Sequence, residues 1–396
     1  MNKIGTIKNK NILFLQGPMG SFFKKLDTLF TQHGATTYKV GFNAGDSFFS
    51  NKYNYIPYKD TRDNYEVFIR AFLQKHKIDK IFLFGDCRFY QRVSIQVARS
   101  LGVAVFVFEE GYIRPNYITM ERFGVNDFSH VSRDANFYKN LTVAKELNAV
   151  DVQYSQFKMV LSSSIYYLVA NIFQFRYPHY IHHRDFSALK EAFFGLRSFV
   201  RKLKYPLFEQ KYLNIVKTTL SKQYFFVALQ TYNDFQVLEH SGYKSIEKFI
   251  IEVLESFSKN NTNIWLVFKH HPVDRGRKNY KSFIEEQARL FGIRDRVLVL
   301  YDTHLPTLLK NAKGTITINS TVGLSSLYHE TPTITLGNAV YDIEGLTCKG
   351  MKLDEFWHKQ IMPDMKLFEK YRSYLIEHTQ LNGSFYGNMP IIKFDK

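Results

Sequence analysis

The stretch Val103–Phe108 reads VAVFVF and runs directly into Glu109-Glu110-Gly111. A continuous apolar run of this length is typical of a strand that is buried on both faces, as strands are in a parallel sheet. Similar runs recur outward along the chain, each alternating with a segment of helical apolar spacing. They occupy residues 11–16, 36–40, 80–84, 224–229, 263–268, 296–300, 315–318 and 332–336. The alternation predicts an α/β protein built on parallel sheets.

The alternation of strands and helices stops once, in the middle of the chain. Residues 112–150 are expected to be loop with short elements, and residues 155–222 to be helical, aromatic and basic. The alternation then resumes. We therefore predict four parts: an N-terminal Rossmann-like domain (1–150), a helical aromatic and basic insert (151–222), a second Rossmann-like domain (223–345) and a helical tail (346–396). The tail is expected to pack back across a cleft between the two domains.

Composition limits the partners and the compartment. The 396 residues carry a formal net charge of +17, which indicates an anionic partner such as nucleic acid, anionic lipid or a phosphorylated substrate. No nucleic-acid-binding signature is recognisable, which weighs against the first of these. Two cysteines cannot build a disulfide framework or a zinc site, and no run of about 18 apolar residues predicts a membrane-spanning helix. Without a signal-peptide pattern, we expect a cytosolic protein.

Polar residues follow several of the predicted strands. Ligands of open α/β sheets bind beyond the carboxyl ends of the strands, and two facing domains would place those ends along one cleft. On the N-terminal rim the candidates are Gln16 and Gly17, Asp86 and Arg88, and Glu109 and Glu110. The turn that contains Gln16 and Gly17 is neither a Walker loop nor a full GxGxxG fingerprint.

The adjacent acids Glu109 and Glu110 are candidates for proton transfer. Side chains alternate along an extended segment, so one acid can face the cleft while the other faces the protein. Their proximity can raise one of the two pKa values, as an acid–base group requires. The alternative is a solvated acidic loop without function.

Asp234 follows the first predicted strand of the second domain and lies four residues after Gln230. A carboxylate in this position is a candidate nucleophile or base, because covalent catalysis by a carboxylate is well precedented in glycosyl transfer. The alternative is an ordinary cap of the next helix, which is the function that Asp most often has before a helix.

Two further clusters suit an anion. In Lys269-His270-His271-Pro272, His271 can donate to a donor phosphate, Lys269 can add positive charge, and Pro272 fixes the turn. A metal site is the rival, but no third ligand at the usual spacing is visible. Asn319-Ser320-Thr321 opens a helix, where it can bind an anion or act as a plain N-cap. No Asp-x-Asp pair follows a strand, which favours a nucleoside monophosphate donor and no metal.

Together these motifs resemble the KpsS-type capsule polysaccharide β-Kdo glycosyltransferase family. The resemblance rests on Gln16-Gly17-Pro18 with Phe22-Phe23, Leu83–Arg88, Phe108–Pro115, Leu229-Gln230 with Asn233-Asp234, Lys269–Pro272 and Ile318–Leu324. It covers residues 11–340. It implies a GT-B-like fold, with two Rossmann-like domains facing a cleft and a helical basic insert.

The resemblance also implies a reaction and the residues that perform it. The reaction is a retaining transfer of Kdo from CMP-β-Kdo to the glycerol of a (lyso)phosphatidylglycerol, which starts the oligo-Kdo linker of a capsular polysaccharide. Asp234 matches the nucleophile of a Gln-x-x-x-Asp motif in related retaining Kdo transferases, and Glu110 takes the acid–base role. CMP binding falls to Gln230, Lys269, His271, Pro272, Asn319, Ser320 and Thr321. The acceptor rim comprises Gln16, Gly17, Asp86, Arg88, Glu109 and Arg114. Neither a cofactor nor a metal is implied.

Two other functions stay open at this point. One is transfer of another CMP-sugar, as in sialyltransferases, and the other is a non-catalytic, membrane-peripheral factor in capsule assembly or export. Leu161–Phe175 is apolar and aromatic but too short to span a membrane, so it is either an interfacial segment or a buried interdomain helix. The expected partners are CMP-Kdo, an anionic phospholipid, the inner face of the inner membrane and other capsule proteins, but not nucleic acid.

Overall fold

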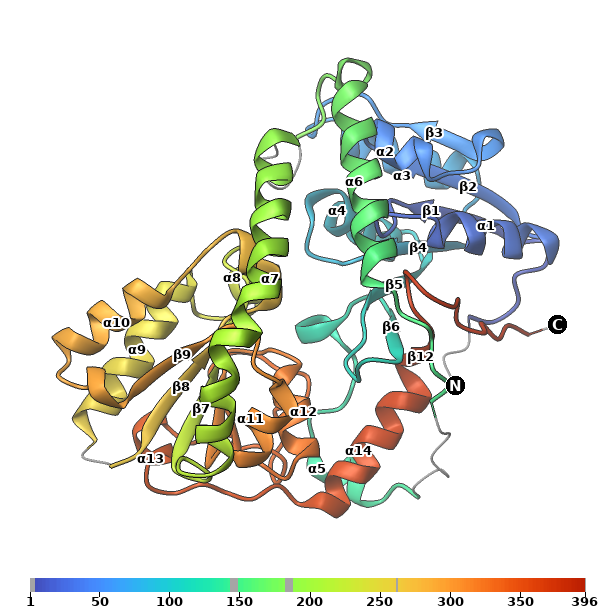
Figure 1. Ribbon diagram of the computed structural model, residues 1–396. Helices are drawn as coiled ribbons and strands as arrows, with labels where there is room; N and C mark the ends of the chain where they lie inside the picture. The colour runs from blue at the N-terminus through green and yellow to red at the C-terminus, as the bar shows by residue number, and fades with distance from the viewer. Residues whose placement is uncertain (1–3, 143–148, 182–187, 261–262, 396) are drawn as a thin grey trace. The chain divides into compact units, whose positions relative to one another are not determined.

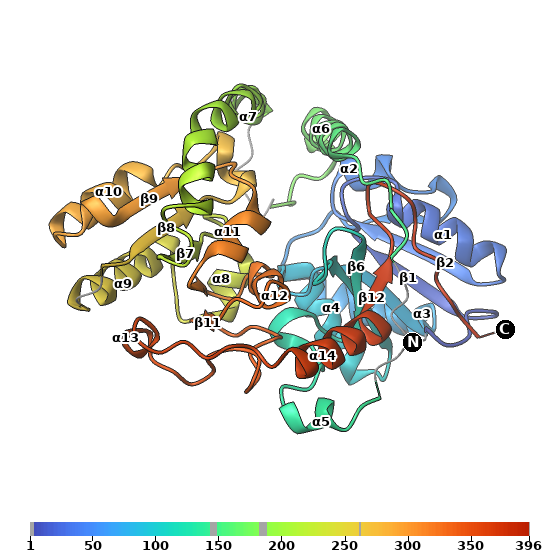
Figure 2. The ribbon, with the colours of Figure 1, turned by 60° about the horizontal axis from the view of Figure 1, so that its bottom comes forward.

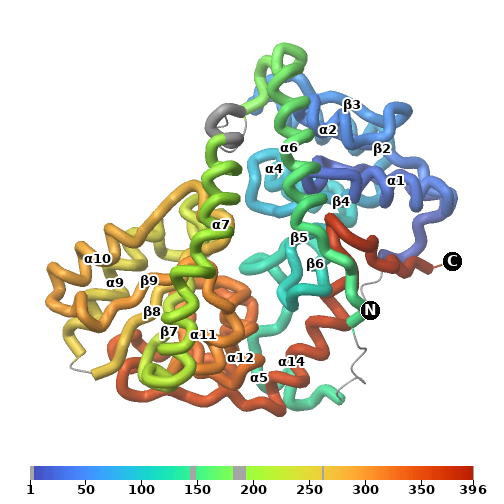
Figure 3. The backbone as a smooth tube through the Cα atoms, in the orientation of Figure 1, coloured from blue at the N-terminus to red at the C-terminus, as the bar shows by residue number. Residues whose placement is uncertain are grey.

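Two α/β units make up the computed structural model of this protein (Figure 1). The structure describes residues 4–142, 149–181, 188–260 and 263–395. The first unit comprises residues 1–130, 144–188 and 374–396, and the second comprises residues 131–143 and 189–373. Each unit therefore combines segments that are distant in the sequence, as the colours along the tube in Figure 3 show.

A seven-stranded sheet forms the centre of the first unit. Its strands are β1 (Asn11–Leu15), β2 (Thr36–Gly41), β3 (Tyr55–Pro57), β4 (Lys80–Phe84), β5 (Ala104–Glu110), β6 (Tyr117–Arg122) and β12 (Gln380–Asn382). Their order in space is β12-β6-β5-β4-β1-β2-β3. The strands from β3 to β5 in this order pair in parallel, whereas β6 pairs antiparallel with both β5 and β12.

Hydrophobic cores cover both faces of this sheet. Leu83 and Val107 belong to a core with α3 (Tyr65–Lys75) and α4 (Phe89–Ser100). Phe82 and Phe108 belong to a second core with α1 (Phe22–Gln32). Burial on both faces is the reason that these strands read as continuous apolar runs.

The second unit has a five-stranded sheet in which every strand pair is parallel. Its strands are β7 (Tyr224–Ala228), β8 (Trp265–Lys269), β9 (Val297–Leu300), β10 (Gly314–Thr317) and β11 (Thr333–Thr335). The order is β11-β10-β7-β8-β9, so the carboxyl ends of β10, β7 and β8 are neighbours. The predicted α/β fold is confirmed in both units; the second sheet is parallel throughout, and the first is parallel except at β6 and β12.

Helices cover the two faces of the second sheet (Figure 2). On one face lie α9 (Ile246–Lys259) and α10 (Lys281–Leu290), and on the other lie α11 (Leu305–Asn311) and the C-terminal part of α7 (Ala188–Lys217). The remaining helices of the chain are α2 (Ala44–Phe48), α5 (Ala135–Lys139), α6 (Gln156–Ile172), α8 (Phe235–His240), α12 (Val322–Tyr328), α13 (Leu353–Phe356) and α14 (Met365–His378).

The division into units differs from the predicted domain boundaries at the insert and at the tail. Helix α6 belongs to the first unit, whereas α7 from residue 189 onward belongs to the second. Residues 182–187 of the predicted insert lie outside the described part of the chain. The segment from residue 374 onward belongs to the first unit, where it supplies β12. Within the described ranges, no helix combines the length and the apolar character that crossing a bilayer demands.

Candidate active site

Gln230 joins two of the predicted donor-side residues. Its Nε2 donates to Asp234 Oδ2 (3.3 Å) and to Asn319 Oδ1 (3.0 Å), and its Oε1 accepts from the Asn319 backbone N–H (3.2 Å). Gln230 follows β7 and Asn319 follows β10, the neighbouring strand. Gln230 is buried while Asp234 is half-buried, so the bridge orients a carboxylate that solvent can still reach.

Asp234 also caps the short helix α8. Its Oδ1 accepts from the Gln236 backbone N–H (2.9 Å), and its Oδ2 accepts from Gln230. The capping alternative that the sequence left open is therefore present, together with a direct contact between Gln230 and Asp234. A carboxylate whose two oxygens accept hydrogen bonds from fixed donors has a defined orientation.

His271 has one defined tautomer in its neutral form. Its Nδ1 accepts from the Val273 backbone N–H (3.2 Å), where the ring caps the 3₁₀ helix η4 (Pro272–Gly276). Because Nδ1 is the acceptor, the ring proton of the neutral imidazole resides on Nε2. Nε2–H is the group that a phosphate oxygen could accept from. Pro272 occupies the first position of η4, as the turn prediction requires.

Lys269 and His270 are buried at the end of β8. The Lys269 ammonium donates to the backbone carbonyl of Tyr301 (3.0 Å), and burial lowers the pKa of Lys269. The His270 ring stacks on Tyr301 (4.6 Å between centroids) and more distantly on Tyr280 (5.8 Å). Burial, with a smaller effect of the Lys269 charge, lowers the pKa of His270 to about 4, so this ring is neutral near pH 7. Both side chains hold the strand end together.

Ser320 and Thr321 lie beside Asn319 at the start of α12. Ser320 Oγ accepts from the Val322 backbone N–H (3.2 Å), and Tyr341 Oη donates to the Ser320 carbonyl. Thr321 occupies the N-cap position, but its hydroxyl makes no capping bond. Both residues are half-buried at the carboxyl end of β10, next to the Gln230 bridge.

The two acids at the end of β5 are in different environments. Glu110 is exposed, with Arg114 Nη2 3.9 Å from its Oε2. Glu109 is only partly exposed and accepts from the Glu110 backbone N–H (3.0 Å). Burial raises the pKa of Glu109 to about 7, and the charges of Glu110 and Asp86 act in the same direction. The sequence indicated that proximity could raise one of the two pKa values; the raised pKa is that of Glu109, and burial rather than proximity is its main cause.

The turn after these acids is held by residues that sequence reasoning missed. Tyr112 Oη donates to Glu121 Oε1 (2.6 Å) and accepts from a backbone N–H (2.6 Å). The Tyr112 backbone N–H donates to Gln380 Oε1 (3.0 Å), which lies on β12. A Cβ on Gly111 would lie 2.1 Å from the Tyr117 carbonyl oxygen, so the turn requires glycine. In the sequence, Glu121 belongs to the segment predicted as loop and Gln380 to the predicted tail. No local motif indicates that either residue contacts Tyr112.

Gln16 is part of a buried network behind its strand end. Its Nε2 donates to Asp46 Oδ2 (3.2 Å), and its Oε1 accepts from Gln91 Nε2 (3.0 Å). Tyr166 of α6 donates to Asp46 Oδ1 (2.9 Å), which fixes that helix on the first unit. A Cβ on the neighbouring Gly17 would meet the Phe23 ring at 2.8 Å, so this turn packs closely. Gln16 is predicted to contact the acceptor, but both ends of its amide are already bonded to protein side chains, so it also has a structural role.

Asp86 and Arg88 lie at the end of β4, near Glu109. Asp86 is buried, and its Oδ2 accepts from the Val125 backbone N–H (2.8 Å). The Arg88 guanidinium lies over the Phe84 ring (5.9 Å to the centroid), and its charge slightly opposes the rise in the pKa of Glu109. Asp86 and Arg88 thus follow β4, while Glu109 lies near the end of β5, the neighbouring strand.

The sequence of the chain matches a family model and several known proteins. The model of the family described as capsule polysaccharide biosynthesis protein matches residues 79–386. The chain is 38% identical to the capsule polysaccharide export protein KpsS of Escherichia coli over 96% of this chain and 98% of that protein. It is 37% identical to the capsule polysaccharide modification protein LipB of Neisseria meningitidis serogroup A, over 96% of this chain and 92% of that protein.

A solved structure also resembles the chain. It is described as Thermosulfurimonas dismutans KpsC, beta Kdo 2,7 transferase. The match covers 91% of this chain and 89% of that protein, with 13% sequence identity and a TM-score of 0.42.

Proposed function

The chain belongs to the capsule polysaccharide biosynthesis protein family, and from that membership we propose that it is a glycosyltransferase. The proposed reaction transfers Kdo from CMP-β-Kdo to the glycerol hydroxyl of a phosphatidylglycerol or lysophosphatidylglycerol, with retention of configuration and without a metal. The observation that carries the proposal is the Gln230 bridge, which holds Asp234 and Asn319 together at two adjacent strand ends.

The first step uses Asp234 as the nucleophile. An Asp234 carboxylate oxygen forms a bond to the anomeric carbon of Kdo, while the bond from that carbon to the phosphate oxygen of CMP breaks. The electron pair of the broken bond leaves with CMP. The Nε2–H of His271 is suited to donate to that phosphate, since Nδ1 is already an acceptor. Ser320 and Thr321, beside Asn319, are the proposed hydroxyl contacts of CMP.

The second step releases the sugar. The acceptor hydroxyl loses its proton to a base and attacks the anomeric carbon, and the Asp234 carboxylate departs. Two inversions at one carbon give net retention. Glu110 is the proposed base because it is the exposed acid of the pair. A pKa of about 7 makes Glu109 the second candidate for this proton, and single variants distinguish the two.

Substitutions at Asp234 test the mechanism. Asn retains the ability to cap α8 but is not a nucleophile, so Asp234→Asn is expected to fold normally and to lose transfer. CMP release and Kdo-lipid formation from CMP-Kdo and lysophosphatidylglycerol are measured, with Asp295→Asn, an exposed acid of the same unit, as the control. Turnover near the wild-type rate in Asp234→Asn would refute the covalent route. Intact-protein mass spectrometry after mixing with CMP-Kdo should show a Kdo adduct.

Two rivals are separated by the choice of ligand. A transferase for another CMP-sugar would prefer CMP-sialic acid over CMP-Kdo in a competition assay. The other rival is a non-catalytic role, which the name of the Escherichia coli relative, capsule polysaccharide export protein KpsS, suggests. That role predicts no stabilisation by CMP. The proposal instead predicts that CMP raises the Tm, that His271→Ala abolishes this shift, and that His304→Ala, at an exposed histidine, does not.

A further inference from the structure

Helix α7 is apolar on the side that faces away from its own unit. Residues 196, 200, 203 and 207 follow a spacing of four, three and four, which places them on one helix face. This apolar ridge, as we call it, comprises Leu196 (65% exposed), Phe199 (61%), Val200 (40%), Leu203 (60%) and Leu207 (79%). The buried residues Glu209 and Val216 lie on the opposite face. Within the described part of the chain, α7 therefore has one buried face and one exposed apolar face, a pattern typical of a helix that docks on a further surface.

The exposed charge of α7 between Phe193 and Tyr212 is positive. Between Phe193 and Tyr212 the chain has five basic residues, and they are Arg197, Arg201, Lys202, Lys204 and Lys211. The single acid in this stretch, Glu209, is buried and accepts from the Tyr301 N–H (2.6 Å), the Asp302 N–H (2.9 Å) and the Thr303 hydroxyl (2.7 Å). The ridge is therefore flanked by cations without an exposed acid among them, which complements an anionic surface.

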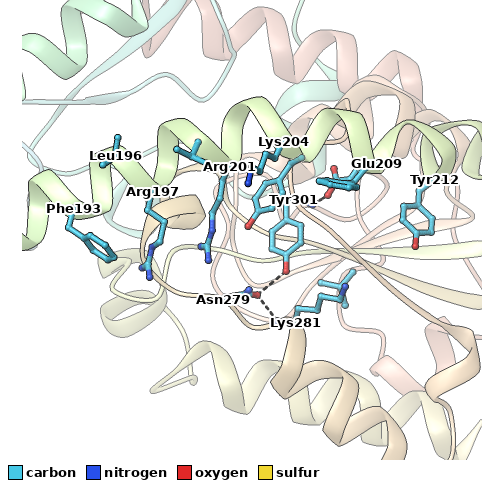
Figure 4. A pocket seen from close by; sticks show the side chains of 14 residues that line it. Phe193, Leu196, Arg197, Arg201, Lys204, Glu209, Tyr212, Asn279, Lys281 and Tyr301 are labelled. Carbon is cyan, nitrogen blue, oxygen red and sulfur yellow. Dashed lines mark hydrogen bonds between the residues drawn. The ribbon is translucent and has the colours of Figure 1, made fainter.

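A pocket of about 730 Å³ adjoins the ridge. It is lined by apolar residues of α7, including Phe193 and Phe208, and by basic residues of α7 and of the start of α10. In Figure 4 the side chains of Arg197 and Arg201 point to the same side of the helix as Asn279 and Lys281. A pocket that combines apolar walls with cations fits a molecule that is anionic at one end and apolar at the other.

We propose that α7 docks this protein on an anionic phospholipid bilayer, with the apolar ridge in the interface and Lys204 and Lys211 among the headgroups. The proposal rests on the proposed lipid acceptor. The sequence left Leu161–Phe175 open as an interfacial segment or a buried interdomain helix, and α6, which contains most of it, has a single basic residue, Lys158. Anionic bilayers attract segments that combine apolar and basic residues, so α7 is the better candidate.

The docking helix is bonded directly to the donor-side loop. Arg197 Nε donates to the Gly276 carbonyl (2.6 Å), and Arg201 Nη1 donates to the Arg275 carbonyl (2.7 Å). Both carbonyls lie in or beside η4, which begins immediately after His271. Docking of α7 would therefore hold the loop that contains His271 and Pro272 at a fixed height above the bilayer.

Vesicle co-sedimentation of the full chain tests the proposal. Wild-type protein should bind vesicles of phosphatidylcholine with 30% phosphatidylglycerol. Leu203→Ser with Leu207→Ser should weaken that binding by roughly tenfold or more, because two leucines no longer enter the interface. Lys204→Gln with Lys211→Gln should weaken binding to the mixed vesicles by a similar factor and leave the weak binding to pure phosphatidylcholine unchanged. Leu290→Ser is the matched control, since Leu290 is 74% exposed on α10 of the same unit.

Each outcome has a definite meaning. Unchanged vesicle binding in the Leu203→Ser, Leu207→Ser variant would overturn the proposal. A second result would also overturn it: a wild-type protein that is dimeric by light scattering and a variant that is monomeric. In that case the ridge would pair with a second copy of the chain. Failure of the transferase proposal appears separately as absent transfer by wild type that still binds vesicles. If both proposals hold, the ridge variant loses transfer to vesicle-embedded lipid and keeps transfer to a dispersed short-chain lysophosphatidylglycerol.

Discussion

The anchoring of α7 by Glu209 predicts a large and local loss of stability on mutation. Glu209→Ala removes the acceptor of two backbone N–H groups and one hydroxyl at the end of β9. Hydrogen bonds to a charged acceptor are worth about 1.5 to 3 kcal/mol each, but water can reach some of these partly buried donors. We therefore expect a loss of about 3 kcal/mol in the free energy of unfolding. For a unit of this size, that loss lowers the Tm by about 6 to 12 °C.

Urea unfolding and hydrogen exchange measure the two parts of this prediction. The amides of Tyr301 and Asp302 should exchange faster in Glu209→Ala, while amides of the first unit keep their protection. Glu209→Gln, which keeps one carbonyl acceptor, should lose less stability than the alanine variant. Glu286→Ala, at an exposed acid of α10, should change stability by no more than about 0.5 kcal/mol. If Glu209→Ala unfolds like the wild type and amides 301 and 302 stay protected, then this carboxylate does not anchor the helix.

Two further predictions concern the first unit. If Glu109 rather than Glu110 is the base of the second step, its pKa of about 7 means that it ionises as the pH rises, so kcat/KM for the acceptor lipid in Kdo-lipid formation should increase through about pH 7. Glu109→Gln should abolish this pH dependence and Glu110→Gln should not; its persistence in Glu109→Gln would exclude Glu109 as its origin. Gly111→Ala should destabilise the protein by about 3 kcal/mol or more in urea, because its Cβ would lie 2.1 Å from the Tyr117 carbonyl oxygen. Gly195→Ala, which meets no atom within 4 Å in a helix, should instead stabilise by about 0.5 to 1 kcal/mol, and equal effects of the two variants would contradict the steric argument.

The sequence predicted the fold where burial alone determines the local pattern. Strands such as β5 and β7 are covered on both faces, so their apolar runs are unbroken. Strand β6 was expected to be loop because it pairs antiparallel near the sheet edge and ends in Glu121 and Arg122. Strand β12 has three residues and exists through its pairing with β6, which no local pattern announces.

The sequence predicted where the candidate site lies better than it predicted the hydrogen-bond partners of the site residues. Residues at strand ends were recognisable, and the structure brings Gln230, Asp234 and Asn319 into contact. The sequence could not tell which of these side chains also support the fold. Asp234 caps a helix as well as contacting Gln230, and Gln16 is tied into a buried network. The network around Gln16 depends on Asp46 and Gln91, which are distant in the sequence and which only the folded chain brings near.

The pairing of β12 with β6 has a consequence for biosynthesis. The ribosome makes β12 only after it has made the whole of the second unit, because residues 189–373 precede it. Until then, the nascent first unit presents β6 as an open sheet edge, and the Tyr112 turn lacks Gln380. An open edge is a template for pairing with another chain. Slow translation of the second unit should therefore prolong the interval in which the nascent protein depends on chaperones to avoid aggregation.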